Sequence, residues 1–322
     1  MDDIAKTRKA PKLAIVVPCY NEEEALPVTA KELLSLLSKM ETDGLVDSSS
    51  YIMCVNDGSR DKTWATIRSL HDADQRIKGI DLAHNRGQQY ALLAGLMTVM
   101  DNCDAAISID ADLQDDPYAM ARMVEDYRNG SDIVYGVRSS RATDTWFKRT
   151  SAHGFYSFQK AMGLETIYDH SDYRLMSNEA LHLLSEYGES NLFLRGIIPQ
   201  IGLKTSIVKY ERHERVAGES KYPLKKMLSF SIDGITSFSA KPMRLIFLTG
   251  LTFLIIDIIV AIYVLLSFFA HSTILGWSSL MLSVWFLGSL ILMGIGIVGE
   301  YIGKIFIEVK NRPRYAIREK IL

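Results

Sequence analysis

Two long apolar segments near the C-terminal end most constrain how this 322-residue chain can fold. Residues 245–270 contain one acidic side chain, Asp257, and no lysine or arginine, and residues 279–299 contain no charged side chain. A helix needs about 20 apolar residues to cross the hydrocarbon core of a bilayer. We therefore predict a hairpin of two transmembrane helices, at residues 245–270 and 279–302. Two buried helices of a soluble bundle are the alternative.

Basic residues flank both apolar segments, and none lies in the connecting residues 271–278. The flanking positions are Lys241 and Arg244 before the first segment and Lys304, Lys310, Arg312 and Arg314 after the second. By the positive-inside rule, both ends of the hairpin face the cytoplasm. The first residues, from Met1 to Ile4, lack the basic-then-apolar order of a signal peptide, which agrees. The prediction is a multi-pass protein of the inner (plasma) membrane, with a cytoplasmic domain at 1–221 and a cytoplasmic tail at 305–322.

Charge and cysteine content disfavour two other classes of protein. A formal net charge of -2, without a basic run, provides no footprint for nucleic acid. Cys19, Cys54 and Cys103 lie in or beside apolar stretches and show no CxxC spacing. We expect reduced thiols in the core, and neither a disulfide nor a cysteine metal site.

Residues 1–221 alternate between strand and helix patterns. Apolar runs predict strands at 12–18, 51–56, 79–82, 105–109 and 132–136, and helical patterns occur at 22–40, 61–74, 87–100 and after Pro117. Such alternation predicts an α/β fold with a mostly parallel sheet covered by helices on both faces. Residues 222–241 have apolar side chains at helical spacing beside Lys225 and Lys226, which predicts an amphipathic helix in the membrane interface. A helix packed on the globular domain is the alternative.

Polar clusters follow the predicted strands, at the edge where parallel sheets bind their ligands. They are Tyr20-Asn21-Glu22, Asp57-Gly58-Ser59, Asp110-Ala111-Asp112 and the stretch from Arg138 to Arg141. Asp110 and Asp112 are two positions apart, so both carboxylates should point to the same side. With the amide oxygen of Gln114, they are hard ligands that suit Mg²⁺ or Mn²⁺. An Asp-x-Asp pair alone is usually solvated surface, but its place after a buried strand favours a metal site.

The first two clusters predict a nucleotide pocket. A carboxylate at Asp57 can accept hydrogen bonds from a base or a ribose, and Gly58 permits the tight turn beside it. Asn21 and Glu22 should lie at the matching end of the neighbouring strand. Helix capping is the alternative reading, because Asn21, Ser59 and Asp61 are good cap residues. The sequence has neither a P-loop motif nor a G-x-G-x-x-G motif, so phosphate grips of those kinds are disfavoured.

Several ordered motifs together resemble the family 2 glycosyltransferases of GT-A fold. These are VPCYNE at 17–22, VNDGSRDKT at 55–63, NRG at 85–87, DADLQD at 110–115 and VAGESKY at 216–222. Within that family, the motifs and the two apolar segments are similar to polyprenyl-phosphate glycosyltransferases, the group of dolichol-phosphate mannose synthase and the bactoprenol glucosyltransferases. Processive relatives carry a Gln-x-x-Arg-Trp motif and more spans, whereas residues 193–196 here read FLRG. Processive synthesis is therefore not expected.

The resemblance implies inverting transfer of one sugar from a nucleotide diphosphate to polyprenyl (undecaprenyl) phosphate, with Mg²⁺ or Mn²⁺ as cofactor. UDP-glucose is the first donor it suggests, ahead of UDP-N-acetylglucosamine and GDP-mannose. Matched to the family pattern, the nucleotide would contact Pro18, Tyr20, Asn21, Glu22, Asp57 and Asp110, and the metal would contact Asp110, Asp112 and Gln114. The candidates for the acceptor phosphate are Arg138, Arg141, Arg149, Arg215, Ser220 and Lys221. Asp172 matches a third acidic position, either orienting the acceptor or acting as a base.

Two alternatives for the function stay open at this point. The acceptor could be another lipid, such as diacylglycerol, or the chain could be a non-catalytic membrane scaffold that binds sugar nucleotides. Intact Asp57, Asp110 and Asp112 argue against the scaffold. Gly294, Gly296, Gly299 and Gly303 allow close helix contact, which is consistent with a hairpin or with a homo-oligomer.

Overall fold

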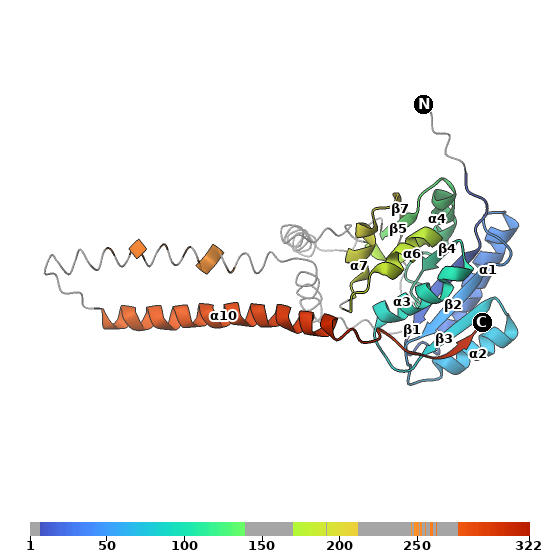
Figure 1. Ribbon diagram of the computed structural model, residues 1–322. Helices are drawn as coiled ribbons and strands as arrows, with labels where there is room; N and C mark the ends of the chain where they lie inside the picture. The colour runs from blue at the N-terminus through green and yellow to red at the C-terminus, as the bar shows by residue number, and fades with distance from the viewer. Residues whose placement is uncertain are drawn as a thin grey trace, which may run out of the picture. The chain divides into compact units, whose positions relative to one another are not determined.

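The computed structural model describes residues 7–138, 170–190, 192–211 and 276–322, and residues 246, 248–250, 252, 255, 258, 259 and 262 (Figure 1). These form two compact units. The first contains the described residues up to 211 together with 312–322, and the second contains those from 246 to 311. Arg141, Arg149, Arg215, Ser220, Lys221 and the predicted helix at 222–241 lie outside the described residues.

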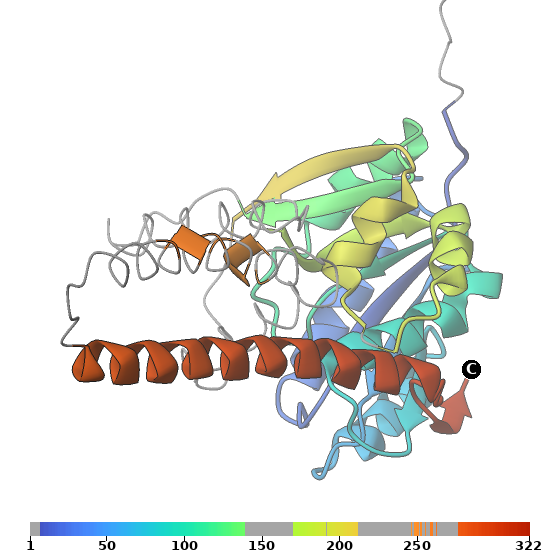
Figure 2. The same cartoon turned by 60° about the vertical axis from the view of Figure 1, so that its left-hand side comes forward.

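The first unit is built on one mixed sheet with the strand order β7-β5-β6-β4-β1-β2-β3-β8, and Figure 2 shows β7 and β8 at its opposite edges. The strands are β1 (Leu13–Cys19), β2 (Tyr51–Asn56), β3 (Ile77–Leu82), β4 (Ala105–Ser108), β5 (Ile133–Arg138), β6 (His170–Ser177), β7 (Thr205–Tyr210) and β8 (Ile317–Ile321). β1 pairs in parallel with β2 and β4, β2 with β3, and β5 with β7. β6 and β8 run antiparallel to their neighbours, so the sheet is less parallel than predicted.

Helices cover both faces of this sheet, as predicted. The longer ones are α1 (Leu26–Thr42), α2 (Thr63–Ala73), α3 (Gln88–Val99), α4 (Ala119–Arg128) and α6 (Asn178–Glu186). Alternate residues of β1, including Leu13 and Ile15, join one buried cluster with residues of α1, α2 and α4. Val16 points to the opposite face and packs against Gly95 of α3. A Cβ added to Gly95 would lie 2.4 Å from Val16 Cγ1. Alternation of side chains along buried strands thus supplies two apolar faces, each covered by helices.

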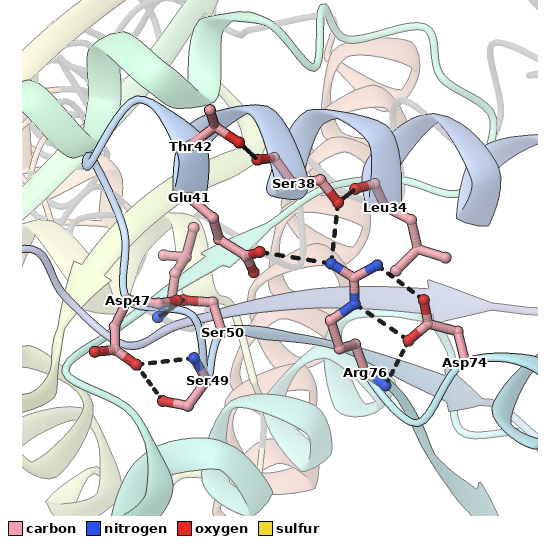
Figure 3. Close-up of polar contacts among 10 residues, drawn as sticks. Leu34, Ser38, Glu41, Thr42, Asp47, Ser49, Ser50, Asp74 and Arg76 are labelled. Atoms are coloured by element: carbon pink, nitrogen blue, oxygen red, sulfur yellow. Dashed lines mark hydrogen bonds and ion pairs between the residues drawn. The ribbon is translucent and has the colours of Figure 1, made fainter.

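A polar network joins α1 to the turn before β3, at the N-terminal ends of the strands (Figure 3). Arg76 donates to Asp74 Oδ2 at 2.8 Å and to Ser38 Oγ at 3.0 Å, and its Nη1 lies 3.6 Å from Glu41 Oε2. On the neighbouring turn, Ser50 Oγ accepts a 2.9 Å bond from the backbone N–H of Leu13. Side chains that bond to one another therefore fasten α1 and the turns before β2 and β3 at the N-terminal ends of these strands.

Among the described residues of the second unit is a long apolar helix, α10 (Trp277–Val309), of 33 residues. Within it, Phe286–Val309 is long and apolar enough to cross a membrane, with a mean hydropathy of 1.8 and none of that stretch buried. It is the one such helix among the described residues. The described residues of the first predicted span are all helical, and a Cβ added to Gly294 of α10 would lie 3.5 Å from Ile246 Cγ2. The two apolar segments therefore lie side by side at that point.

Candidate functional site

Three loops meet at the carboxyl edge of the sheet because their strands are in parallel register. Cys19 at the end of β1 pairs with Asn56 at the end of β2, and Asp57 donates its backbone N–H to the carbonyl of Cys19 at 2.9 Å. β4 lies on the other side of β1 and leads into Asp110 and Asp112. The clusters at 20–22, 57–59 and 110–112 therefore lie at one edge, as the sequence predicts.

The loops after β1 and β2 are tied together by reciprocal bonds between side chains and backbone. Asn21 donates its backbone N–H to Ser59 Oγ at 3.0 Å, and its own Oδ1 accepts from the N–H of Arg60 at 2.9 Å. Glu23 forms the same two-way pairing with Asp61 and Lys62. Asn21 has a φ of 56°, a left-handed conformation that asparagine tolerates better than most residues.

The helix-capping alternative is wrong for Asn21 and Ser59. α1 begins after Ala25 and α2 begins after Lys62, and neither N-cap residue makes a side-chain capping bond. Asp61 Oδ1 does accept the backbone N–H of Thr63, at 3.0 Å, inside the first turn of α2. The polar residues of these loops therefore set the shape of the loops themselves.

Asp57 holds a third loop against this edge. Its side chain is only 2% exposed, and its two carboxylate oxygens accept the backbone N–H groups of Arg86 and Gly87, both at 2.8 Å. Burial raises the pKa of Asp57, and these two bonds partly offset the rise. Gly58 has a φ of +59°, and a Cβ there would lie 2.6 Å from the backbone N of Asn85. Glycine is therefore required where the loop after β2 touches the loop after β3.

Asp110 has a raised pKa among the carboxylates of the site. Burial raises its pKa to about 7, with smaller contributions from the nearby carboxylates of Asp172, Asp115 and Asp112. Gln88, the first residue of α3, donates from Nε2 to Asp110 Oδ1 at 2.7 Å. A partly exposed carboxylate crowded by other carboxylates is a place where a cation binds favourably.

The turn after Asp110 places Asp112 close to it. This turn contains a residue with an unusual backbone conformation. Leu113 has a φ of 51°, which costs free energy for a residue with a branched side chain. Asp112 Oδ1 accepts the backbone N–H of Gln114 at 3.2 Å, which closes the turn. Local strain of this kind is typical of functional loops.

Arg138 lies at the end of β5 as predicted, but its guanidinium has a protein partner. Its Nη2 donates to Asp115 Oδ1 at 3.1 Å, and Tyr210 Oη donates to the same oxygen at 2.6 Å. Asp115 is 2% exposed, so the ion pair is shielded from water on the carboxylate side. Arg138 thus helps to neutralise the acidic cluster of Asp110, Asp112, Asp115 and Asp172.

Asp172 on β6 is held by two arginines. Arg195, in the short helix α7 (Leu194–Ile197), donates from Nε and Nη2 to the two carboxylate oxygens, both at 3.1 Å. Arg174, which is 1% exposed, donates to Asp172 Oδ1 at 2.7 Å. Burial opposes the charge of Arg195, yet the Asp172 carboxylate raises its pKa overall. The side chain of Arg195 is 41% exposed, so this ion pair is open to solvent on the arginine side.

The carboxylates of Asp110 and Asp112 fit a divalent cation that a bound substrate also coordinates. Among the described residues, no group of three His, Cys, Asp or Glu side chains is placed to hold a metal ion. Mg²⁺ is commonly held by one or two carboxylates plus the phosphate oxygens of a substrate. Asp110 and Asp112 can supply those carboxylates, so their chemistry fits such a metal.

Sequence reasoning missed Gln88, Asp115 and Arg195. Gln88 directly follows the predicted NRG motif, and Asp115 ends the DADLQD motif, so both had a signal in the sequence. Arg195 lies in the FLRG stretch that was compared with the Gln-x-x-Arg-Trp motif, but its contact with Asp172 arises only when β6 and α7 come together in the folded chain. Pro18 and Glu22 are partly exposed and Tyr20 is 42% exposed at the same edge. Their contacts with a nucleotide stay predictions.

Comparison with known proteins gives a consistent result. The model of glycosyl transferase family 2 matches residues 14–195. A Bacillus subtilis (strain 168) protein described as "Uncharacterized glycosyltransferase YkoT" is 50% identical, over 95% of this chain and 91% of its own length. The SfII prophage-derived bactoprenol glucosyl transferase of Shigella flexneri is 38% identical, over 96% of this chain and 98% of its own length.

Solved structures resemble the chain more remotely. Glucosyl-3-phosphoglycerate synthase from Mycobacterium tuberculosis superposes with a TM-score of 0.42 at 17% identity, covering 72% of this chain and 79% of its own.

Proposed function

The chain belongs to glycosyl transferase family 2 and is a glycosyltransferase, and we propose that it transfers one glucose from UDP-glucose to polyprenyl (undecaprenyl) phosphate. The observation that carries this proposal is the Asp110 and Asp112 pair at the sheet edge of a chain that is similar over nearly its whole length to a bactoprenol glucosyl transferase. The family assignment leaves no reason to keep the non-catalytic scaffold. A different lipid acceptor remains the second candidate.

The loops described above supply a donor site. Tyr20, Asn21 and Glu22 lie beside the loop of Asp57, and Asp57 fixes the backbone of the loop after β3. Asp110, Asp112 and Gln114 would hold Mg²⁺ or Mn²⁺ together with the diphosphate. Such a cation supplies charge stabilisation to the leaving nucleoside diphosphate.

The acceptor phosphate is already an anion, so it needs cations more than it needs a general base. Arg138 and Arg195 bring guanidinium groups to the described part of the site. Arg141, Arg149, Arg215, Ser220 and Lys221 are proposed to complete the phosphate site. Both oxygens of Asp172 accept from arginine, which favours an orienting role over proton transfer. The phosphate oxygen attacks the anomeric carbon from the side opposite to the leaving nucleoside diphosphate. This attack inverts the configuration at that carbon.

The strand β8 supports an even number of membrane crossings. It follows α10 in the chain, yet it pairs with β3 in the same sheet that carries the site. A single crossing would leave β8 and β3 on opposite sides of the bilayer. The helical residues between 246 and 262 lie in the first predicted span, which with α10 gives the two crossings of the proposed hairpin. With the flanking basic residues, the catalytic domain is proposed to face the cytoplasm.

The function is tested with purified protein, undecaprenyl phosphate and a panel of labelled donors: UDP-glucose, UDP-N-acetylglucosamine and GDP-mannose. We expect label to enter the organic phase with UDP-glucose and to require Mg²⁺ or Mn²⁺. Incorporation from another donor alone would correct the sugar, and no incorporation from any donor would overturn the proposal.

Sidedness is tested with protease. Inverted membrane vesicles should lose residues 1–240 on protease treatment, and intact spheroplasts should protect them. The opposite pattern would place the site on the outer face of the membrane, away from cytoplasmic sugar nucleotides.

A further inference from the structure

We propose that the C-terminal strand β8 positions the donor-binding loops through a chain of hydrogen bonds that runs from Arg318 to Asp81, Asn56 and Ser59. The inference rests on the proposed function in that it assigns these loops to the donor. It makes the last residues of the chain a working part of the site, although they follow the membrane helix in sequence.

The first link in this series of hydrogen bonds joins Arg318 to a fully buried carboxylate. Asp81 of β3 is 0% exposed, and Arg318 of β8 donates from Nε to its Oδ2 at 2.7 Å and forms an ion pair with it through Nη2. Asn56, 1% exposed at the end of β2, donates from Nδ2 to the other oxygen of Asp81 at 2.7 Å. A buried carboxylate needs such partners, because an uncompensated charge in the interior is costly.

The contacts continue from Asn56 into the loops. Asn56 Oδ1 accepts the backbone N–H of Ser59 at 3.3 Å, and Ser59 Oγ accepts the backbone N–H of Asn21 at 3.0 Å. The amide of Asn56 can use its oxygen for Ser59 only while its nitrogen faces Asp81. The orientation of Asn56 is therefore set by Asp81, whose second oxygen is held by Arg318.

Asp57, which follows Asn56, connects these contacts to the loop after β3. Its carboxylate holds the N–H groups of Arg86 and Gly87, and Gly58 touches the backbone of Asn85. A rotation of Asn56 would disturb Ser59 and the position of Asp57 together. Loosening at β8 is thus expected to reach all three loops at the sheet edge.

The neighbouring residue of β8 provides a matched control. Glu319 accepts from Trp64 Nε1 at 3.1 Å and pairs with Arg68, and both partners belong to α2. Successive side chains of a strand point to opposite faces, so Glu319 supports the packing of β8 without entering the chain of Arg318. If β8 only covers a sheet edge, changes at the two positions should have the same effect.

The experiment compares R318A, R318K and E319Q in the full-length protein. Hydrogen exchange of the backbone amides in loops 57–61 and 84–87 is measured without any nucleotide, so it does not depend on the proposed function. Donor kinetics are then measured with UDP-glucose and undecaprenyl phosphate. We expect faster exchange in both loops and a KM for UDP-glucose raised about tenfold in R318A. The kcat and the KM for the lipid should change little.

R318K should restore part of the protection because lysine keeps a charged donor near Asp81. E319Q should leave exchange in both loops and the donor KM at wild-type values, even if it lowers thermal stability. The inference is overturned if R318A leaves loop exchange unchanged, or if R318A and E319Q alter the loops equally. Absence of turnover in the wild-type protein would overturn the proposed function and leave the exchange test valid.

Discussion

Replacing Asp110 with asparagine should stabilise the metal-free protein at neutral and alkaline pH while abolishing its activity. Burial and the surrounding carboxylates of Asp172, Asp115 and Asp112 raise the pKa of Asp110 to about 7. Asparagine has nearly the same shape, and its Oδ1 can still accept the 2.7 Å bond from Gln88 Nε2. The substitution therefore removes the crowded charge and keeps the packing.

The magnitude follows from the difference between folded and unfolded states. An aspartate in an unfolded chain has a pKa of about 3.9, so a difference of about three pKa units corresponds to at most about 4 kcal/mol. Between about pH 4 and pH 7 the unfolded chain releases a proton that the folded chain retains, so the stability of the wild type falls as pH rises. D110N has no carboxyl group at this position, so its stability does not fall in this way. The difference in free energy of unfolding between D110N and wild type should grow from near zero at pH 4 to its full value above pH 7.

The assay is thermal unfolding of detergent-solubilised protein in EDTA at pH 5, 6, 7 and 8. Each kcal/mol is worth about 2–4 °C for a domain of this size, so D110N should melt several degrees above wild type at pH 8. Adding Mn²⁺ together with UDP should raise the melting temperature of wild type and have less effect on D110N. D101N serves as the control, because Asp101 is exposed and precedes β4. A D110N protein that is less stable than wild type at pH 8, or equally stabilised at every pH, would refute the reasoning.

Three further predictions concern the loops and the acceptor. D112N should lower turnover by orders of magnitude in a folded protein, and EDTA should do the same to wild type; near-normal rates in either case would remove the metal from the account. G58A should lower the melting temperature and weaken UDP binding, because its Cβ would collide with the backbone of Asn85; wild-type UDP affinity would contradict this. R215A and K221A should each cost about 1.5–3 kcal/mol, roughly ten- to a hundredfold in kcat/KM for the lipid, with nucleotide affinity nearly unchanged; weakened nucleotide binding with intact lipid kinetics would move both residues to the donor side.

The strands and helices that the sequence predicts well are those with strong apolar patterns. β2 matches its predicted bounds, and β1, α1 and α3 differ by a few residues at their ends. β8 was missed and its residues were expected in a tail, because IREKI carries three charged side chains in five positions. β6 was missed for a related reason: its residues Asp172 and Arg174 are buried as an ion pair, which an apolar pattern cannot reveal.

The site shows the same division between local and long-range information. Asp110 and Asp112 are predictable because a polar pair after a buried strand must lie at the carboxyl edge of the sheet. The partners of the acidic cluster are not, since Arg195 and Tyr210 reach it from elements far along the chain. The sequence also suggested free cations for the acceptor, whereas the structure pairs Arg138 with Asp115. Pairings of this kind depend on the order of strands, which local patterns do not contain.

The central claim is that the acceptor is a lipid phosphate, and acceptor competition tests it most directly. Purified protein with labelled UDP-glucose and Mn²⁺ is offered undecaprenyl phosphate, undecaprenol or diacylglycerol, with D112N run in parallel. The account predicts label in the organic phase with undecaprenyl phosphate alone, and none with D112N. Equal labelling of undecaprenol or of diacylglycerol by the wild-type protein would contradict it.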